Sequence, residues 1–268
     1  YKWQTGCGNC PRVKNDNKSW FFDRTSKMWA DKKKYFGVIR RLAVVGVSDW
    51  ITNEAKKSFL QDAKIIKRIY NWIDLSKFYP REDDMRSNYG IEKNRFLVLL
   101  ISAGWSESSS KFSDMKKLIE LCGDDICFVV AGSGLDNAVF PPNVVKAGYI
   151  DSIDELAKLY SMADVYVHLS RADTFGKVIA EAMACGTPAI VYNTTALPEV
   201  IGDNCGEVAE LGATNIYNKL CRIKHNGKAY YTSNCVNRAR AIFNAEQNIL
   251  DYIGLYKEIM KECSGILN

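Results

Sequence analysis

The chain has 268 residues, of which 47% are hydrophobic and 25% are charged. These are globular proportions, so they exclude a disordered or collagen-like chain and leave room for more than one small module. The longest nearly uncharged apolar stretch, residues 96–105, is too short to cross a bilayer, and we expect a soluble protein. Nine cysteines with a single Cys-x-x-Cys pair favour reduced thiols in a cytosol over a disulfide framework.

The net charge of +5 is concentrated at one end of the chain. Residues 1–80 carry 17 Lys/Arg against 7 Asp/Glu, and the remainder carries 19 against 24. A basic first third favours an anionic partner or a membrane surface. A solvated lysine-rich surface explains it equally well, because the lysines are interspersed with apolar residues.

From Arg41 onward, short β-branched runs alternate with helical patterns, which is typical of an α/β protein with a parallel sheet. Ser48 is placed as the cap of the first predicted helix. The elements predicted first are a strand at 41–47, a helix from Ser48 through Leu60 and a strand at 64–70. Residues 79–95 are polar and weakly periodic, and they are the best linker candidate.

A second α/β unit is predicted after this linker. Its strands are expected at 96–102, 126–131, 144–149, 165–169 and 188–192, and its helices at 114–122, 153–162, 175–185 and around Glu199. Residues 213–260 are predicted to be helical throughout. Residues 1–40 are aromatic and basic with weak periodicity, and no element is predicted there.

The most informative stretch is residues 164–203, where a strand ends near His168, a loop carries Asp173, and a helix carries Glu181. Open α/β sheets bind ligands at the carboxyl ends of their strands, and helix N-termini attract anions. Asp173 can therefore contact the sugar, and Glu181 the ribose, of one bound sugar nucleotide. In the competing interpretation Asp173 caps the helix and Glu181 is solvated. An unpaired carboxylate on a small, apolar helix face is costly, which favours a ligand role.

These residues carry a family resemblance. TFGKVIAEAMACGTPAIV followed by LPEVIGD resembles the donor motif of retaining glycosyltransferases of family 4, with Asp173 where that family usually has Glu. The segment from Ser48 to Pro80 is similar to the family's stretch before its interdomain linker. TGCGNCP and the turn at Trp105 resemble a bacterial surface-polysaccharide branch.

The resemblance implies a GT-B fold with two Rossmann-like domains. Residues 1–80 would be the end of the acceptor-binding domain, 81–245 the donor-binding domain, and 246–268 a terminal helix returning to the acceptor domain. The rest of the acceptor domain would precede Tyr1. Neither His168 nor His225 matches the family's acceptor-side histidine. His168 is interpreted as a wall of the donor cleft or as a satisfied core histidine.

The resemblance also implies which residues contact the donor. Asp173 and Lys111 are the catalytic candidates, and Glu181 would hold the ribose. The other donor-contact candidates are Thr174, Phe175, Gly176, Thr194, Thr195, Gly132, Tyr149 and Ile150.

Recognition of the diphosphate is expected to depend on Lys111. The family has a basic residue after the first donor-domain strand, which meets charge developing on the departing nucleotide and takes the place of a metal. Trp105 occupies the usual arginine position here, and Lys111 is the cation available nearby. A surface lysine opening a helix is the alternative interpretation.

Two further motifs are weaker. Residues 131–134 (AGSG) begin like a dinucleotide fingerprint, but Asn137 stands at the third glycine position, which disfavours a dehydrogenase. Cys7 and Cys10 have the spacing of half a zinc site. No second Cys/His pair follows nearby, so an unmetallated loop is favoured.

The function implied by the resemblance is transfer of a sugar, with retention, from a nucleoside diphosphate sugar. The expected acceptor is a saccharide or polyprenyl-linked saccharide of a bacterial surface polysaccharide, such as lipopolysaccharide O-antigen, capsule or exopolysaccharide. We expect no cofactor, metal or nucleic acid, and a cytoplasmic location with peripheral association to the inner membrane. The alternatives are a catalytically silent fragment that only binds nucleotide or a partner, and a GT-B epimerase or phosphorylase.

Overall fold

The computed structural model describes residues 2–11, 13, 22–82 and 85–264. The chain forms two compact units, unit 1 (Tyr1–Ile69 with Leu250–Asn268) and unit 2 (Tyr70–Ile249). The division therefore precedes the boundary expected at residue 80. Ile73 forms a bridge with Asn244, and the ring of Phe78 lies 6.3 Å from that of Tyr160, so the segment after Ile69 packs within unit 2.

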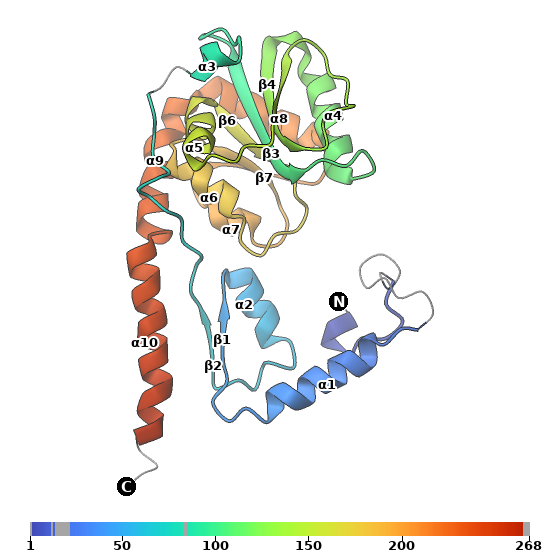
Figure 1. The fold of residues 1–268 in the computed structure, drawn as a ribbon, viewed down its shortest axis with the longest axis vertical. Helices are drawn as coiled ribbons and strands as arrows, with labels where there is room; N and C mark the ends of the chain where they lie inside the picture. Colours follow the sequence, from blue (N-terminus) through green and yellow to red (C-terminus); the bar gives the residue numbers. More distant parts are fainter. Residues whose placement is uncertain (1, 12, 14–21, 83–84, 265–268) are drawn as a thin grey trace. The chain divides into compact units, whose positions relative to one another are not determined.

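Unit 1 contains a two-stranded parallel sheet against which one helix, α2, packs (Figure 1). Its elements are η1 (Lys2–Gln4), α1 (Thr25–Gly37), β1 (Ala43–Gly46), α2 (Asp49–Lys56), β2 (Ile65–Arg68) and the part of α10 (Ala245–Ser264) beyond Ile249. Ser48 caps α2 as predicted, because its hydroxyl accepts a hydrogen bond from the amide of Ile51 at 3.2 Å. Helix α1 has no predicted counterpart.

Unit 2 is built on a six-stranded parallel sheet with the strand order β5-β4-β3-β6-β7-β8 (Figure 1). The strands are β3 (Phe96–Gly104), β4 (Ile126–Ser133), β5 (Val144–Gly148), β6 (Val165–His168), β7 (Ala189–Tyr192) and β8 (Gly206–Ala209). The central strands are continuous apolar runs because both faces of the sheet are covered. Residues 97–100, for example, have no solvent-exposed surface.

Two helical layers enclose this sheet. Helix α4 packs against α8, whereas α6 packs against α5, α7 and α9. The helical elements are α3 (Met85–Asn88), α4 (Ser110–Cys122), η2 (Gly123–Asp125), α5 (Ile153–Met162), α6 (Lys177–Ala184), α7 (Leu197–Ile201), α8 (Ala213–Asn226), α9 (Lys228–Ile242) and the start of α10. No helix in the described part of the chain has the length and apolar character needed to cross a membrane.

Helix boundaries differ from prediction where local capping decides them. Helix α4 begins four residues before the predicted start at Asp114, because Ser109 caps it and accepts from the amide of Phe112 at 3.3 Å. Strand β8 was not predicted. The region expected to be helical throughout consists of three helices, with breaks at Gly227 and Phe243.

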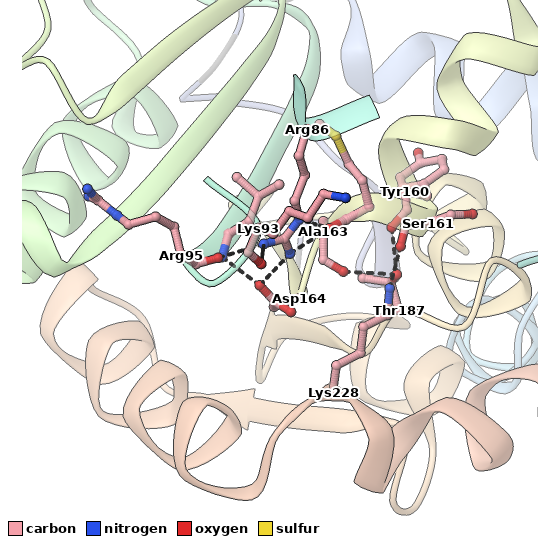
Figure 2. Close-up of polar contacts among 11 residues, drawn as sticks. Arg86, Lys93, Arg95, Tyr160, Ser161, Ala163, Asp164, Thr187 and Lys228 are labelled. Carbon is pink, nitrogen blue, oxygen red and sulfur yellow. Dashed lines mark hydrogen bonds and ion pairs between the residues drawn. The ribbon is translucent and has the colours of Figure 1, made fainter. Parts of the chain in front are cut away.

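The predicted linker at 79–95 is hydrogen-bonded to unit 2 near the amino ends of β3 and β6. We call this side of the sheet, where its strands begin, the amino edge. Arg86 donates to the carbonyl oxygens of Lys93, Arg95 and Met162 at 2.7 to 3.2 Å, and to the carboxylate of Asp164 at 2.8 Å (Figure 2). Asp164 also accepts from the amide of Leu97 at 2.7 Å. These bonds hold the described part of the segment within unit 2.

Candidate functional site

A cavity of about 240 Å³ opens at the carboxyl ends of β3 and β6 in unit 2. Its polar lining comes from three places in the sequence: the end of β3, the first turn of α4, and the loop between β6 and α6. The polar side chains are Ser102, Lys111, His168, Ser170 and Asp173. The structure thus places the two catalytic candidates in the wall of one cavity, at the sheet edge where open α/β proteins bind ligands.

Asp173 is held at both its backbone and its side chain. Its amide donates to the hydroxyl of Thr195 at 3.1 Å, and one carboxylate oxygen lies 2.7 Å from Nε2 of His168. Burial of the carboxylate raises its pKa, but hydrogen bonds with His168 and Ser170 and the charge of Lys111 outweigh burial. The pKa of Asp173 is therefore lowered and the group is an anion at neutral pH.

Lys111 lies in the first turn of α4 and reaches into the same cavity. Its ammonium nitrogen hydrogen-bonds the hydroxyl of Ser102 and lies 5.5 Å from the ring centre of Trp105. Partial burial lowers its pKa, and the negative charge of Asp173 opposes that shift. Among the described residues that line the cavity, Lys111 is the one lysine or arginine. It is therefore positioned to meet an anionic ligand group.

Trp105 lines the cavity and is also packed against the end of β4. Its side chain is 6% exposed, and its indole nitrogen donates to the carbonyl of Ala131 at 2.9 Å. A side chain at Gly134 would come within 2.4 Å of the backbone of Trp105, and one at Gly132 within 1.8 Å of the carbonyl of Ser102. The end of β4 lies directly against the backbone of this turn. The AGSG segment therefore has glycines at positions 132 and 134, where a larger residue would collide with that backbone.

Glu181 is mostly buried in α6, where Tyr160 donates a hydrogen bond to it at 3.4 Å. Burial raises the pKa of Glu181, with the charge of Lys177 opposing the shift. It is not a solvated surface carboxylate, as the competing interpretation held. Glu181 is not among the residues that line the cavity, and its role toward a ribose stays a prediction.

The remaining donor-contact candidates occupy different surroundings. Phe175 differs most from expectation: its side chain is 2% exposed and packs edge-to-face on Phe243 at 5.2 Å, because it completes an aromatic core cluster. That leaves its backbone for any ligand contact. Gly176 precedes α6 as its N-cap, with a φ of +86°, and Thr195 has a φ of +51°.

Thr194 is the candidate with unused hydrogen-bonding capacity. Its hydroxyl oxygen is buried, and no described residue pairs with it. Thr174 is exposed, Tyr149 is 60% exposed and Ile150 is half-buried. Thr174, Thr194, Tyr149, Ile150 and Gly132 do not line the cavity, and their donor contacts stay predictions.

The sequence-based prediction missed a polar group beside the cavity. Arg171, two residues before Asp173, donates to Asp114 of α4 at 2.8 Å, and Tyr192 at the end of β7 donates to the same carboxylate oxygen at 2.8 Å. The side chain of Arg171 is 42% exposed. The available signal was a charged residue directly after a strand's carboxyl end, but nothing in the sequence pairs Arg171 with Asp114.

Metal ligands do not assemble in the described residues, where no group of three or more His, Cys, Asp or Glu side chains could hold an ion. Cys7 and Cys10 are free thiols in unit 1. The expectations that the reaction needs no metal and that these two cysteines are unmetallated stay predictions.

The sequence of unit 2 matches a known family. Residues 115–240 match the family described as glycosyl transferases group 1. The match covers less than half of the chain and includes α5, α6 and the loop that carries Asp173. It agrees with the predicted enzyme class.

Characterised relatives include several transferases. The chain is 26% identical over 246 residues to N-acetyl-alpha-D-glucosaminyl L-malate synthase of Bacillus anthracis, covering 85% of this chain and 62% of that protein. It is 44% identical over 63 residues to O-antigen chain mannosyltransferase B of Escherichia coli, covering 24% and 16%. The chain therefore spans less than two thirds of the length of these relatives.

Solved structures confirm the predicted GT-B-like α/β fold. Sucrose-phosphate synthase from Thermosynechococcus elongatus has a TM-score of 0.75 at 20% identity, covering 95% of this chain and 65% of that one. Anabaena HepE in complex with UDP and glucose has a TM-score of 0.68 at 18% identity, covering 88% and 68%. At these identities the likeness establishes the fold alone.

Proposed function

We propose that unit 2 is the donor-binding part of a glycosyltransferase that takes its sugar from a nucleoside diphosphate sugar. The observation that carries the proposal is the convergence of Lys111 and Asp173 on one cavity at the carboxyl edge of the sheet. A cation and an anion that line the same cavity match a ligand that carries a diphosphate at one end and sugar hydroxyls at the other.

The chemistry follows from these two charges. The Asp173 carboxylate accepts hydrogen bonds from hydroxyls of the bound sugar and so fixes its orientation. Lys111 meets the negative charge that develops on the departing diphosphate, and the amides at the start of α6 add to this stabilisation. A preorganised cation of this kind supports departure of the nucleotide without a metal.

Glu181 is proposed as the ribose contact. It stands eight positions after Asp173, in the family pattern, and its buried carboxylate has one long hydrogen bond from Tyr160. A ribose diol would supply the donors that a buried carboxylate needs, because an incompletely paired buried anion costs free energy.

We also propose that the sugar is transferred with retention of configuration at its anomeric carbon, as in family 4. A cytoplasmic role in bacterial surface polysaccharide synthesis, with a saccharide or lipid-linked saccharide acceptor, belongs to the same proposal. It is supported by the motif resemblance and by the similarity to O-antigen chain mannosyltransferase B.

Calorimetric titration of the chain with UDP, UDP-glucose, GDP and GDP-mannose tests the donor assignment. We expect binding of at least one nucleotide and its sugar. Glu181→Gln should weaken nucleotide binding about tenfold or more, since a hydrogen bond to a charged group contributes about 1.5 to 3 kcal/mol. The matched control is Glu120→Gln, whose carboxylate is exposed on α4. No binding of any of these compounds, or equal effects of the two variants, would overturn the assignment.

The second candidate is a silent fragment that binds nucleotide without releasing sugar. It is favoured by Asp173 in place of the family's Glu and by Trp105 in place of the arginine. Measuring sugar release from the nucleotide sugar that binds separates the two candidates. Release that Lys111→Ala abolishes supports the transferase, and binding without any release supports the silent fragment.

Peripheral membrane association is proposed to involve α1 in unit 1. Met28 and Tyr35 are 52% and 67% exposed, and Val38 just after the helix is 73% exposed. Residues 24–41 carry seven Lys/Arg and one Asp. Exposed bulky apolar side chains among cations fit the interface of an anionic lipid bilayer.

Flotation with vesicles of phosphatidylglycerol and phosphatidylcholine tests this association. We expect binding to the anionic vesicles, reduced when Lys32, Lys33 and Lys34 are all changed to Gln. The control changes Lys116, Lys117 and Lys146 in unit 2 to Gln. Equal binding to neutral vesicles, or no loss in the α1 variant, would contradict the proposal.

A further inference from the structure

A line of hydrogen bonds runs from the interior of the sheet to the cavity. The hydroxyl of Tyr166 lies 2.8 Å from Nδ1 of His168, and Nε2 of His168 lies 2.7 Å from Asp173. Tyr166 is fully buried, His168 is 8% exposed, and the side chain of Asp173 is 32% exposed. Both ring nitrogens of His168 are thus engaged, one by the core and one by a carboxylate at the ligand cavity.

The position of the protons along this line follows from burial. Burial raises the pKa of Tyr166 well above its ordinary value, and the charges of Glu181 and Asp173 add to the shift, so the phenol keeps its hydrogen. We assign this hydrogen to the bond with Nδ1 of His168, which leaves the ring hydrogen on Nε2, where it is donated to the Asp173 carboxylate.

We propose that His168 is a positioning residue that holds the carboxylate of Asp173 toward the donor sugar, with Tyr166 selecting the tautomer that makes this possible. This inference rests on the proposed function, because it assigns the pair to the sugar end of the same site. His168 acts through Asp173 and is not itself assigned a contact with the sugar.

The surroundings of Asp173 support a role beyond packing. Thr195 anchors its backbone and His168 its side chain, while Lys111 faces it across the cavity. A carboxylate has about four acceptor positions, so the bond from His168 leaves capacity for sugar hydroxyls. Aspartate is also one methylene shorter than the glutamate of the family motif. Held at two points, the carboxylate presents a defined direction to the sugar, and ligands that need another direction are selected against.

Variants that keep and variants that remove the donor at Nε2 have opposite expected effects. His168→Gln places an amide N–H near the position of Nε2 and keeps a donor for Asp173, whereas the shorter His168→Asn does not reach it. Tyr166→Phe removes the hydrogen donated to Nδ1, so the ring is free to turn an unprotonated Nε2 toward the carboxylate. The matched control is Tyr231→Phe, since Tyr231 is 2% exposed in α9 and its hydroxyl bonds to Asn226.

The measured quantity is the ratio of the dissociation constants of a nucleoside diphosphate and its sugar, with UDP and UDP-glucose or GDP and GDP-mannose as probes. We expect binding of the diphosphate to stay within about twofold of the parent in every variant. Relative binding of the nucleotide sugar should fall about tenfold in His168→Asn and about threefold in Tyr166→Phe. It should stay within about twofold in His168→Gln and in Tyr231→Phe.

The outcomes separate this inference from the proposed function. If the parent chain binds neither pair of nucleotides, the proposed function fails and the sugar role of His168 fails with it. If the parent binds them and His168→Asn leaves the ratio unchanged, only the role of His168 is overturned. An equal loss in His168→Gln and His168→Asn would also overturn it, because a donor at the Nε2 position would then make no difference.

Discussion

In the six-stranded sheet of unit 2, similar side chains have different roles at the amino ends of the strands (the amino edge) and at their carboxyl ends (the carboxyl edge). At the amino edge, Arg86 directs all five of its N–H groups to backbone carbonyls and to Asp164 (Figure 2). At the carboxyl edge, Lys111 has one hydrogen bond, to Ser102, and the Thr194 hydroxyl has no partner among the described residues. Satisfied polar groups hold a fold together, whereas groups with capacity left are available to a ligand.

Lys228 is the exception at the amino edge. It begins α9, is largely buried, and donates to the carbonyl of Ser161 at 2.5 Å (Figure 2). Burial lowers its pKa to about 8, although the charge of Asp164 opposes the shift. This lysine therefore makes the amino edge sensitive to pH in the mildly alkaline range.

The largest expected effect comes from breaking the amino edge. Arg86→Met leaves Asp164 and three backbone carbonyls without their partner, so we expect a loss of about 3 to 5 kcal/mol in the free energy of unfolding. Urea denaturation measures it, with Arg240→Met on the exposed face of α9 as control. A loss under about 1 kcal/mol would show that Arg86 is not structural.

The pH dependence of Lys228 gives the next largest effect. Its pKa in the folded chain is below its unfolded value of about 10.4, so the unfolded chain binds more protons between these values and stability rises with pH. Relative to Lys228→Met, the parent should gain roughly 2 kcal/mol of unfolding free energy between pH 7 and 9.5. Parallel pH profiles for the two proteins would contradict this expectation.

At the carboxyl edge, changing Glu181 should affect nucleotide binding and protein stability differently. Burial raises its pKa, which means that its charge costs folding free energy at neutral pH. Glu181→Gln should therefore lower nucleotide affinity about tenfold while leaving the unfolding free energy equal or higher. Calorimetry and urea denaturation of the same samples test both halves. A variant that loses stability in proportion to affinity would indicate a structural role.

The smallest effect is expected from Lys111. It is partly exposed, so its contact with a diphosphate is screened, and Lys111→Ala should reduce the preference for a nucleoside diphosphate over the monophosphate about three- to tenfold. Lys117→Ala, exposed on the same helix, is the control. An unchanged preference for UDP over UMP, or GDP over GMP, would remove Lys111 from the phosphate site.

The sequence predicted most of unit 2 because its signals are local. Helix α5 has the predicted bounds, since Ser152 caps it and its apolar spacing is regular. The resemblance singled out Lys111 and Asp173, and the rule that parallel strands end at the same edge predicted that they lie near one another. Strand β8 was missed because four residues beginning with glycine carry little strand signal.

What the sequence does not show is of a different kind. The donor contact of Phe175 stays a prediction, but the packing of its side chain on Phe243, at the end of α9 and far along the chain, has no local signal. The pairing of Arg171 with Asp114 and the network around Arg86 likewise join residues that no sequence period relates. Local sequence patterns predict the helices, the strands and the side of the sheet where the strands end. Contacts between side chains that are distant in the sequence depend on how these elements pack.

Hydrogen exchange with and without the nucleotide that binds is the most direct test of the difference between the two edges. We predict that the nucleotide slows exchange of backbone amides at residues 102–112, 169–178 and 193–197. Amides at 86–97, 162–165 and 228–232, on the amino edge, should be unchanged. Protection confined to the amino edge, or spread equally over both, would contradict the assignment of the donor site to the carboxyl ends of the strands.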